Sequence, residues 1–251
     1  MDLHVFPVLG LPDVVAGDDI ARSIVEAIES GGTAGRRIEK GDVFVVAQKI
    51  VSKAEDALVR LDGVEPSAFA REWGAAHAKD PRAIEVVLRE SRRIVRMDRG
   101  VLIAETHHGF VCANAGVDAS NVPAGWVTVL PRDPDASARR IRDTVSTAFG
   151  CTVGVVVADT FGRPWREGFV NVALGVAGLQ PVIDYRGTSD QFGRPLESTI
   201  IALADEIAAA AEIVMRKTAR IPVAVVRGAA EWAGEGSGRQ LLRDPSQDMF
   251  R

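Results

Sequence analysis

The sequence predicts a globular fold that combines helices and strands. Segments with helical spacing of apolar residues alternate along the chain with short, strongly apolar segments. Between residues 93 and 116, three strand-like segments also follow one another, as in a meander or two hairpins. The 251 residues are enough for one large domain or two closely joined ones.

The composition excludes several classes of protein. The formal net charge is −4, so no overall basic field is available to hold nucleic acid. The apolar runs are strand-sized, far from the ~20 residues of a membrane span. Cys112 and Cys151 form neither a metal-ligand spacing nor a disulfide framework, and the first residues lack the pattern of a signal peptide. The expected compartment is therefore the cytoplasm, with no membrane or nucleic-acid partner.

The first half of the chain opens with a helix that Asp18 or Asp19 caps and Gly31-Gly32 ends. A buried strand is expected over 42–52, with polar residues in its second half. Two helices follow, separated at Asp80-Pro81. These two helices are expected over 66–79 and 81–93. After them, strands are expected over 93–97, 101–106, 109–116 and 126–131.

In the second half, Asp135 is expected to cap a helix that Gly150 closes. The next segment, 151–159, is the most apolar strand and is expected to be central in its sheet. The expected elements after it are a loop at 160–168, a small-residue segment at 171–179, a strand at 181–187, a polar loop at 188–195, a helix at 202–217 whose late Arg216-Lys217 suits its dipole, and a strand at 221–228. No linker stands out; a boundary between two parts would fall between about 80 and 130.

The most informative motif is "VVVADTFGRPWREG", residues 155–168. Asp159 and Thr160 follow an apolar strand, and ligands tend to bind at the carboxyl ends of such strands. An aspartate with an adjacent hydroxyl can hold Mg²⁺ against phosphate. Arg163 and Arg166 add donors for carboxylate or phosphate, and Trp165 can stack on a flat ring. The pattern favours a metal site beside an anion site over a plain solvated loop.

Three other loops carry similar chemistry. "GLPDV" (10–14) is a tight turn able to expose backbone N–H groups, although an ordinary strand-to-helix turn has the same pattern. In "AQKIVSKAED" (47–56), Lys49 and Lys53 would share a helical face and suit phosphate, or would be solvated lysines. "NAGVDASNV" (114–122) offers Asp118, Ser120 and Asn121 either to Mg²⁺ or Mn²⁺ or to Asx turns.

Several familiar motifs are absent from the sequence. It contains no G-x-x-x-x-G-K-[ST] phosphate loop, no G-x-G-x-x-G between a strand and a helix, and no G-x-S-x-G nucleophile elbow. The glycines of "GEGSGR" (234–239) indicate a mobile loop, and His107-His108 a turn with two exposed imidazoles.

Taken together, "GLPDV", "AQKIVSKAE", "DPRAIEVVLRES", "GFVCANAGVDASNV", "ADTFGRPWREG" and "PVAVVRG" resemble the coenzyme F420-0:γ-glutamyl ligase family in order and spacing, from about residue 5 to 251. The resemblance implies an α+β fold with mixed sheets and packed helices, in two closely joined subdomains that assemble as a homodimer. It also implies the stand-alone form, without the C-terminal nitroreductase-like domain, as a single ligase domain over 1–251.

The same resemblance implies the activity and the site. The family uses GTP, Mg²⁺ or Mn²⁺ and often K⁺ to add L-glutamate to the deazaflavin precursor F420-0 through an acyl phosphate. Two divalent ions are expected. The implied residues are Leu11, Pro12, Asp13, Val14, Gln48, Lys53 and Asn121 for GTP, Asp118 and Asp159 for one divalent ion and for catalysis, Thr160 for a second ion, and Arg163 and Arg166 for the precursor or glutamate. Gln48 departs from the serine that some relatives have.

Two other functions use the same residues. A metal-dependent nucleotide phosphohydrolase would need the two aspartates but no acceptor carboxylate. A GTP-binding regulator would bind the nucleotide without turnover.

Overall fold

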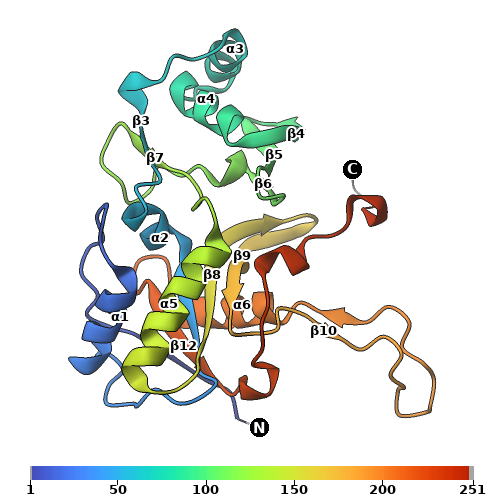
Figure 1. The fold of residues 1–251 in the computed structure, drawn as a ribbon. Helices are drawn as coiled ribbons and strands as arrows, with labels where there is room; N and C mark the ends of the chain where they lie inside the picture. Colours follow the sequence, from blue (N-terminus) through green and yellow to red (C-terminus); the bar gives the residue numbers. More distant parts are fainter. Residues whose placement is uncertain (1, 249–251) are drawn as a thin grey trace.

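The computed structural model describes residues 2–248, and its largest element is a five-stranded mixed sheet (Figure 1). The strands lie in the order β1 (His4–Pro7), β12 (Val223–Arg227), β2 (Val43–Ala47), β8 (Gly154–Arg163) and β9 (Arg166–Ala177). Strands β2 and β8 are parallel, and the other neighbours are antiparallel. As predicted, β8 lies inside the sheet, because β2 and β9 flank it.

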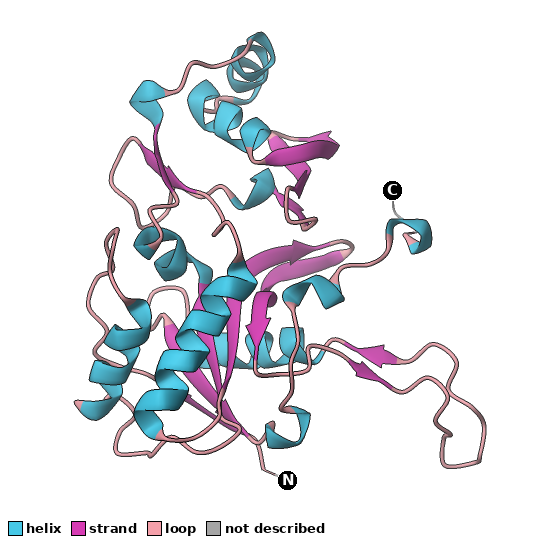
Figure 2. Cartoon of the chain, viewed as in Figure 1, coloured by secondary structure: helices cyan, strands magenta, loops and turns pink. Residues whose placement is uncertain are grey.

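Helices cover both faces of this sheet (Figure 2). Alternate residues of a strand point to opposite faces. In β2, Phe44 and Val46 accordingly pack with α1 (Ile20–Glu29), α2 (Gln48–Ala54) and α5 (Pro134–Phe149). Val43 and Val45 pack on the other face with α6 (Leu203–Met215). Burial on both faces explains why these strands are apolar throughout.

Residues 58–128 form smaller sheets with their own apolar clusters. Strands β4 (Ser91–Asp98), β5 (Val101–Thr106) and β6 (Val111–Ala113) form one sheet, and β3 (Leu58–Arg60) pairs with β7 (Trp126–Thr128) in another. The helices of this region are α3 (Ala68–His77) and α4 (Pro81–Arg89), and Ile84 and Val87 of α4 are buried with Leu102 of β5.

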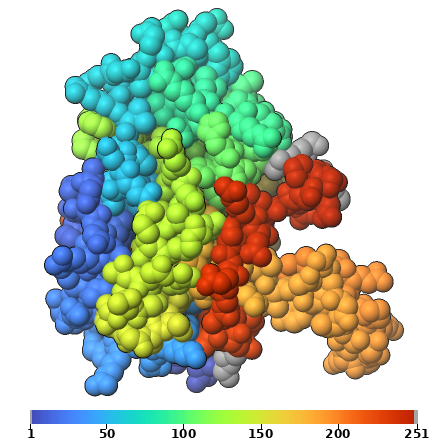
Figure 3. Space-filling view, in the orientation of Figure 1, coloured from blue at the N-terminus to red at the C-terminus, as the bar shows by residue number. Residues whose placement is uncertain are grey.

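A long arm leaves the body after β9. Strands β10 (Ile183–Asp184) and β11 (Ile200–Ile201) pair at its base, and the residues between them project away from the rest of the chain (Figure 3). The short 3₁₀ helices of the chain are η1 (Leu61–Gly63), η2 (Asn114–Gly116), η3 (Ala230–Trp232), η4 (Gly238–Leu241) and η5 (Pro245–Gln247).

The structure confirms the α+β class with mixed sheets and helices, and it corrects several boundaries. The strand predicted over 42–52 ends at Ala47, where α2 begins. The helix predicted over 81–93 ends at Arg89, because Ser91 already starts β4. The strand predicted over 181–187 is reduced to the two residues of β10. In the tail, η4 begins at Gly238, where a mobile loop was expected.

The loop predicted over 160–168 is wrong. Strands β8 and β9 form a continuous hairpin, with Thr160 opposite Asn171 and Arg163 opposite Arg166. Pro164 and Trp165 make the turn, and Trp165 has a left-handed φ of 58°. A proline at a turn costs no ladder hydrogen bond, so the Gly, Pro and charge pattern that resembles a loop is compatible with a hairpin.

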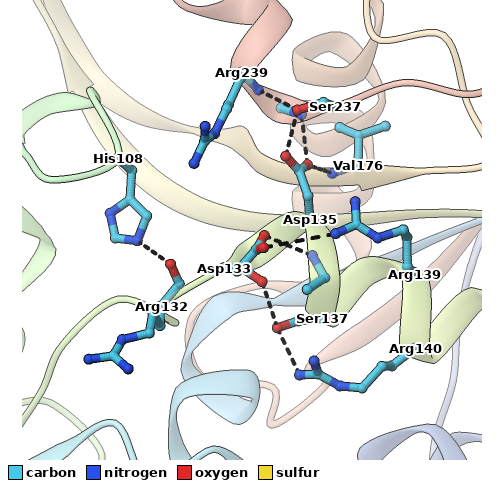
Figure 4. A network of polar contacts seen from close by, with 12 residues as sticks. His108, Arg132, Asp133, Asp135, Ser137, Arg139, Arg140, Val176, Ser237 and Arg239 are labelled. Atoms are coloured by element: carbon cyan, nitrogen blue, oxygen red, sulfur yellow. Dashed lines mark hydrogen bonds and ion pairs between the residues drawn. The ribbon is translucent and has the colours of Figure 1, made fainter.

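The cap predicted for α5 is also wrong. Asp133, not Asp135, accepts the cap hydrogen bond, from the Ala136 N–H at 2.9 Å. Asp135 is buried, and its Oδ1 accepts from the N–H groups of Val176 and Gly238, both at 2.8 Å (Figure 4). Its Oδ2 accepts from the Ser237 hydroxyl at 2.5 Å. Asp135 therefore joins α5, the edge strand β9 and the C-terminal tail.

We predict that Asp135→Ala lowers the free energy of unfolding by about 2–5 kcal/mol, because it leaves buried N–H groups without an acceptor. The matched control is Asp133→Ala, which removes an N-cap and a solvent-exposed ion pair with Arg139, and is expected to cost about 1 kcal/mol. Urea denaturation of both variants checks the difference. An equal loss, or a larger one for Asp133→Ala, would contradict the role assigned to Asp135.

Candidate functional site

Several predicted site residues lie near the carboxyl end of β2 and the neighbouring middle part of β8. The two strands are parallel, and Ala47 is in register with Ala158. Gln48, the first residue of α2, and Asp159, which is still within β8, therefore follow the last paired residues of the two strands. Helix α2 starts at Gln48, and Figure 1 shows it between the five-stranded sheet and the β3–β7 pair.

Lys49 connects this edge to the 114–122 loop. Its ammonium forms an ion pair with Oδ2 of Asp118. The same Nζ donates to the Ser120 carbonyl at 2.8 Å and to the Ser120 hydroxyl at 2.6 Å. Oδ1 of Asp118 accepts from the Ser120 N–H at 2.7 Å. Burial acts to raise the pKa of Asp118, but the hydrogen bonds from Lys49 and Ser120 outweigh it and lower that pKa. Asp118 is thus held as a carboxylate.

An unusual backbone places Asp118. Asn114, Ala115 and Gly116 all have positive φ, of 52°, 51° and 73°. This turn ends the strand predicted over 109–116 at Ala113. Beyond it, Asp118 and Thr128 exchange two backbone hydrogen bonds, of 3.1 and 2.8 Å, which extend β7 by one bridge. The loop conformation is therefore fixed by both a strained turn and a strand pair.

Asp159 is half-buried at the end of the apolar part of β8. Burial raises the pKa of its carboxyl, and the Asp118 carboxylate raises it further. The Thr160 N–H and the charges of Lys217 and Lys49 act in the opposite direction. The hydrogen bond and the positive charges around Asp159 therefore do not fully offset the cost of burying its ionised carboxylate. A bound cation would offset the rest of this cost.

The neighbouring Cys112 on β6 is buried, and its thiol is affected by the same charge. Burial, and then the charge of Asp159, raise the pKa of Cys112 to about 12. The thiol therefore stays protonated at neutral pH, and a protonated thiol is a poor nucleophile.

Thr160 is surrounded by a polar network. Its hydroxyl donates to Oδ1 of Asn171 at 2.8 Å and accepts from Nζ of Lys217 at 2.7 Å. Asn171 in turn donates to Oε2 of Glu212 on α6 at 3.0 Å. Lys217 and Asn171 were not predicted as site residues. The only sequence signal for Lys217 was its place at the end of a helix, where a lysine suits the dipole.

The segment around the loop at 10–14 contacts α2. Leu11 and Val14 of the loop belong to the same apolar cluster as Val51 and Ala54 of α2, and the Gly17 N–H just beyond the loop donates to the Ala54 carbonyl at 2.9 Å, next to Lys53. Val14 is buried in the core and Leu11 packs against it, whereas Pro12 and Asp13 are exposed. The fold thus brings this loop close to Lys53, which is partly exposed in the last turn of α2.

The other predicted nucleotide residues differ in exposure. Gln48 is buried, and its amide contacts the Ser52 hydroxyl and, at 3.4 Å, the Val129 carbonyl. Asn121 is exposed and has a φ of 57°, in the loop that Lys49 anchors.

Arg163 and Arg166 lie apart from the aspartates. They face each other at the end of the β8–β9 hairpin. Four residues of extended strand separate Arg163 from Asp159, a distance of about 13 Å. Arg163 donates to the Glu167 carbonyl at 2.9 Å, while its buried Nε has no hydrogen-bond partner. The predicted anion site is therefore a separate feature at the hairpin tip.

The ligand set fits one hard divalent cation. Within residues 2–248 no group of three or more His, Cys, Asp or Glu is placed to hold a metal. Two carboxylates from separate segments, Asp118 on a loop and Asp159 on β8, nevertheless act on each other. Mg²⁺ typically takes one or two protein carboxylates and completes its octahedron with water and phosphate oxygens. Zinc or copper would require nitrogen or sulfur ligands, which this site lacks.

Comparison with known proteins identifies the family of this chain. The family model described as F420-0:Gamma-glutamyl ligase matches residues 9–228. The chain is 45% identical to "Coenzyme F420:L-glutamate ligase" of Methanothermobacter thermautotrophicus, over 100% of both chains. Identity to the enzyme of the same name is 45% in Methanopyrus kandleri (99% of this chain, 98% of the relative) and 38% in Haloarcula marismortui (99% and 96%).

Along residues 2–248, no helix combines the length and the apolar composition that crossing a membrane requires. The family match extends over both ends of the site, from the loop at 10–14 to strand β12. The chain belongs to the F420-0:γ-glutamyl ligase family.

Proposed function

We propose that this protein is a GTP-dependent ligase that adds L-glutamate to F420-0 and gives γ-glutamylated coenzyme F420. The relatives named above carry the name coenzyme F420:L-glutamate ligase, and this chain matches them over 96–100% of their length. The observation that carries the proposal is the charge cluster at the sheet edge. Asp118 comes from a loop and Asp159 from β8, and Lys49 and Lys217 act on them as cations.

The proposed reaction has two steps. A carboxylate oxygen of F420-0 attacks the γ-phosphorus of GTP, so a P–O bond forms to the acceptor and the bond to the β-phosphate oxygen breaks, releasing GDP. The amine of L-glutamate then attacks the acyl carbon, loses a proton and expels phosphate as an amide forms. No protein nucleophile is needed, consistent with the protonated Cys112 and the missing serine elbow.

The chain's own residues have electrostatic roles in these steps. An anionic acceptor must approach a polyanionic donor, so positive charge is required between them. Asp118 and Asp159 would hold Mg²⁺ or Mn²⁺, which when bound neutralises phosphate charge. Lys49 keeps Asp118 ionised and in place. Lys217 adds a fixed positive charge beside Thr160.

The nucleotide is proposed to lie along α2 toward the loop at 10–14. Lys53 in the last turn of α2 is next to Ala54, which binds this loop through Gly17. Leu11 and Val14, anchored in the core, would support Pro12 and Asp13 against the guanine. Gln48 and Asn121 complete the proposed contacts. K⁺ is a further proposed cofactor.

The direct test is incubation with F420-0, L-glutamate, GTP and Mn²⁺, followed by mass spectrometry. The expected result is the addition of glutamyl units, lost with EDTA. A nucleotide phosphohydrolase would instead release phosphate from GTP regardless of F420-0 and glutamate. A regulator would bind GTP and release nothing. Either pattern would contradict the ligase proposal.

We predict that Asp159→Asn lowers glutamyl transfer by orders of magnitude, since charge stabilisation by a metal is worth several kcal/mol. Its melting temperature without metal should be unchanged or higher, because burial already disfavours the ionised carboxyl. Turnover and thermal melts with and without Mn²⁺ measure both effects.

The matched control for this variant is Asp205→Asn. Burial also raises the pKa of Asp205, but its Oδ1 accepts the Ala173 N–H at 2.8 Å, a structural contact. This control should turn over normally per folded molecule. If Asp159→Asn instead melts early and keeps normal turnover, Asp159 is a structural residue.

We predict that Lys53→Met weakens GTP binding by about 1.5–3 kcal/mol, the range for a hydrogen bond to a charged group. The control is Lys40→Met, the same change at an exposed lysine near the opposite end of β2. Calorimetric titration of GTP with Mn²⁺ measures both variants. Equal affinities for the two would leave Lys53 as a surface lysine.

We further propose that the chain forms a homodimer of two-part subunits. In support, the projecting arm carries exposed apolar side chains, including Phe192 at 77% exposure (Figure 3). Light scattering should give twice the 26.8 kDa chain mass, and Phe192→Asp should shift the mass toward the monomer. Ile213→Asp, at a 78% exposed position on α6, should not. Dissociation by Ile213→Asp alone would exclude the arm as the interface.

A further inference from the structure

The Thr160 hydroxyl is occupied by a lysine where a second divalent ion was expected. Nζ of Lys217 lies 2.7 Å from Oγ1, and the same oxygen donates its proton to Oδ1 of Asn171 at 2.8 Å. A hydroxyl has one proton and two lone pairs, so a single lone pair is left for any further partner.

A metal on that lone pair would be close to the ammonium. Mg²⁺ binds oxygen at about 2.1 Å, and the two lone pairs point in roughly tetrahedral directions, so the ion would lie roughly 4 Å from Nζ. Three positive charges would then be adjacent at a neutral ligand. The carboxylate in this network, Glu212, contacts Asn171 rather than Thr160. The ligand set at Thr160 does not fit a second divalent ion.

The proposed cation site between Asp118 and Asp159 has more acceptor positions than the Thr160 hydroxyl. Lys49 also contacts Asp118, but a carboxylate has about four acceptor positions and can be shared with a cation. Asp159 supplies a second negative charge. A divalent ion there meets two carboxylates and one shared ammonium, whereas at Thr160 it would meet a hydroxyl and an ammonium.

Lys217 is an exposed residue in the bend just after helix α6, and two hydrogen bonds attach that helix to the sheet. The side chain of Asp205 in its first turn accepts the Ala173 N–H of β9 at 2.8 Å. Near its end, Glu212 accepts from Asn171 of the same strand at 3.0 Å. The helix is thus attached to β9 at both ends, and Lys217 follows directly after its C-cap, Arg216. The bend that carries the Lys217 ammonium therefore starts from a helix that is attached to β9, two residues after the end of α6.

We infer that the Lys217 ammonium takes the place of the second divalent cation, so that each chain binds one divalent ion, between Asp118 and Asp159. Lys217 then supplies the other positive charge beside the phosphate. This inference rests on the proposed nucleotide and metal site, but it concerns the number of ions and is independent of which acceptor is used.

The test is a Mn²⁺ titration followed by electron paramagnetic resonance, with the full chain saturated by a GTP analogue whose β,γ-bridge is a methylene group. Free Mn²⁺ gives the signal, so bound ions per chain are counted directly. The wild type should bind one Mn²⁺. Lys217→Glu, which replaces the ammonium by a carboxylate, should bind two. Arg216→Glu, the same charge change one residue earlier, should bind one.

A second variant covers misfolding of Lys217→Glu. Lys217→Gln should still bind one Mn²⁺, while its affinity for the analogue should fall by about tenfold or more with the loss of the charge. Two Mn²⁺ in the wild type, or none, would overturn the inference. So would a single Mn²⁺ in folded Lys217→Glu, or unchanged analogue affinity in Lys217→Gln.

The count needs no turnover, so it separates this inference from the proposed function. One Mn²⁺ per chain without glutamyl addition would leave the inference standing and remove the ligase activity. Glutamyl addition with two ions per wild-type chain would do the reverse.

Discussion

The parallel pairing of β2 and β8 is the constraint on which the site depends. The pairing of these two strands stops at Ala47 and Ala158. Strand β2 ends there and the chain enters α2, which supplies Lys49, whereas β8 continues to Arg163 and supplies Asp159 and Thr160 from the part that lies beyond β2. The other strand pairs of this sheet are antiparallel. They stabilise the sheet without bringing two carboxyl ends together.

The second requirement is charge balance at that edge. A carboxylate that loses water must gain hydrogen bonds or cations, or its pKa rises. Asp118 gains them from Lys49 and Ser120, and its pKa falls. Asp159 gains less, and its pKa rises. The difference between two chemically identical side chains is the physical reason to place a divalent ion between them. It also explains why a lysine, rather than another acid, is suited to the adjacent Thr160 hydroxyl.

Most helices and the apolar strands could be predicted from the sequence, because their periodicity reports directly which faces are buried. The β8–β9 hairpin could not. Its outer half carries glycine, proline and charge, and it is held by pairing with residues such as Asn171 that the local pattern does not reveal. The role predicted for Asp135 was wrong for a related reason. A cap and a buried acceptor have the same local sequence, and only the approach of β9 and the tail distinguishes them.

The sequence by itself determined the residue types of the site and their place after apolar segments: Asp118, Asp159 and Thr160 with nearby lysines. It also determined the family, because several specific motifs occur in order. Only the tertiary structure decided which charges meet. Lys49 is 69 residues from Asp118, and Lys217 is 57 residues from Thr160. Pairing over such separations depends on sheet order and on the docking of α6. Electrostatic energy depends on the distance between two charges in space, and the number of residues between them along the chain does not give that distance.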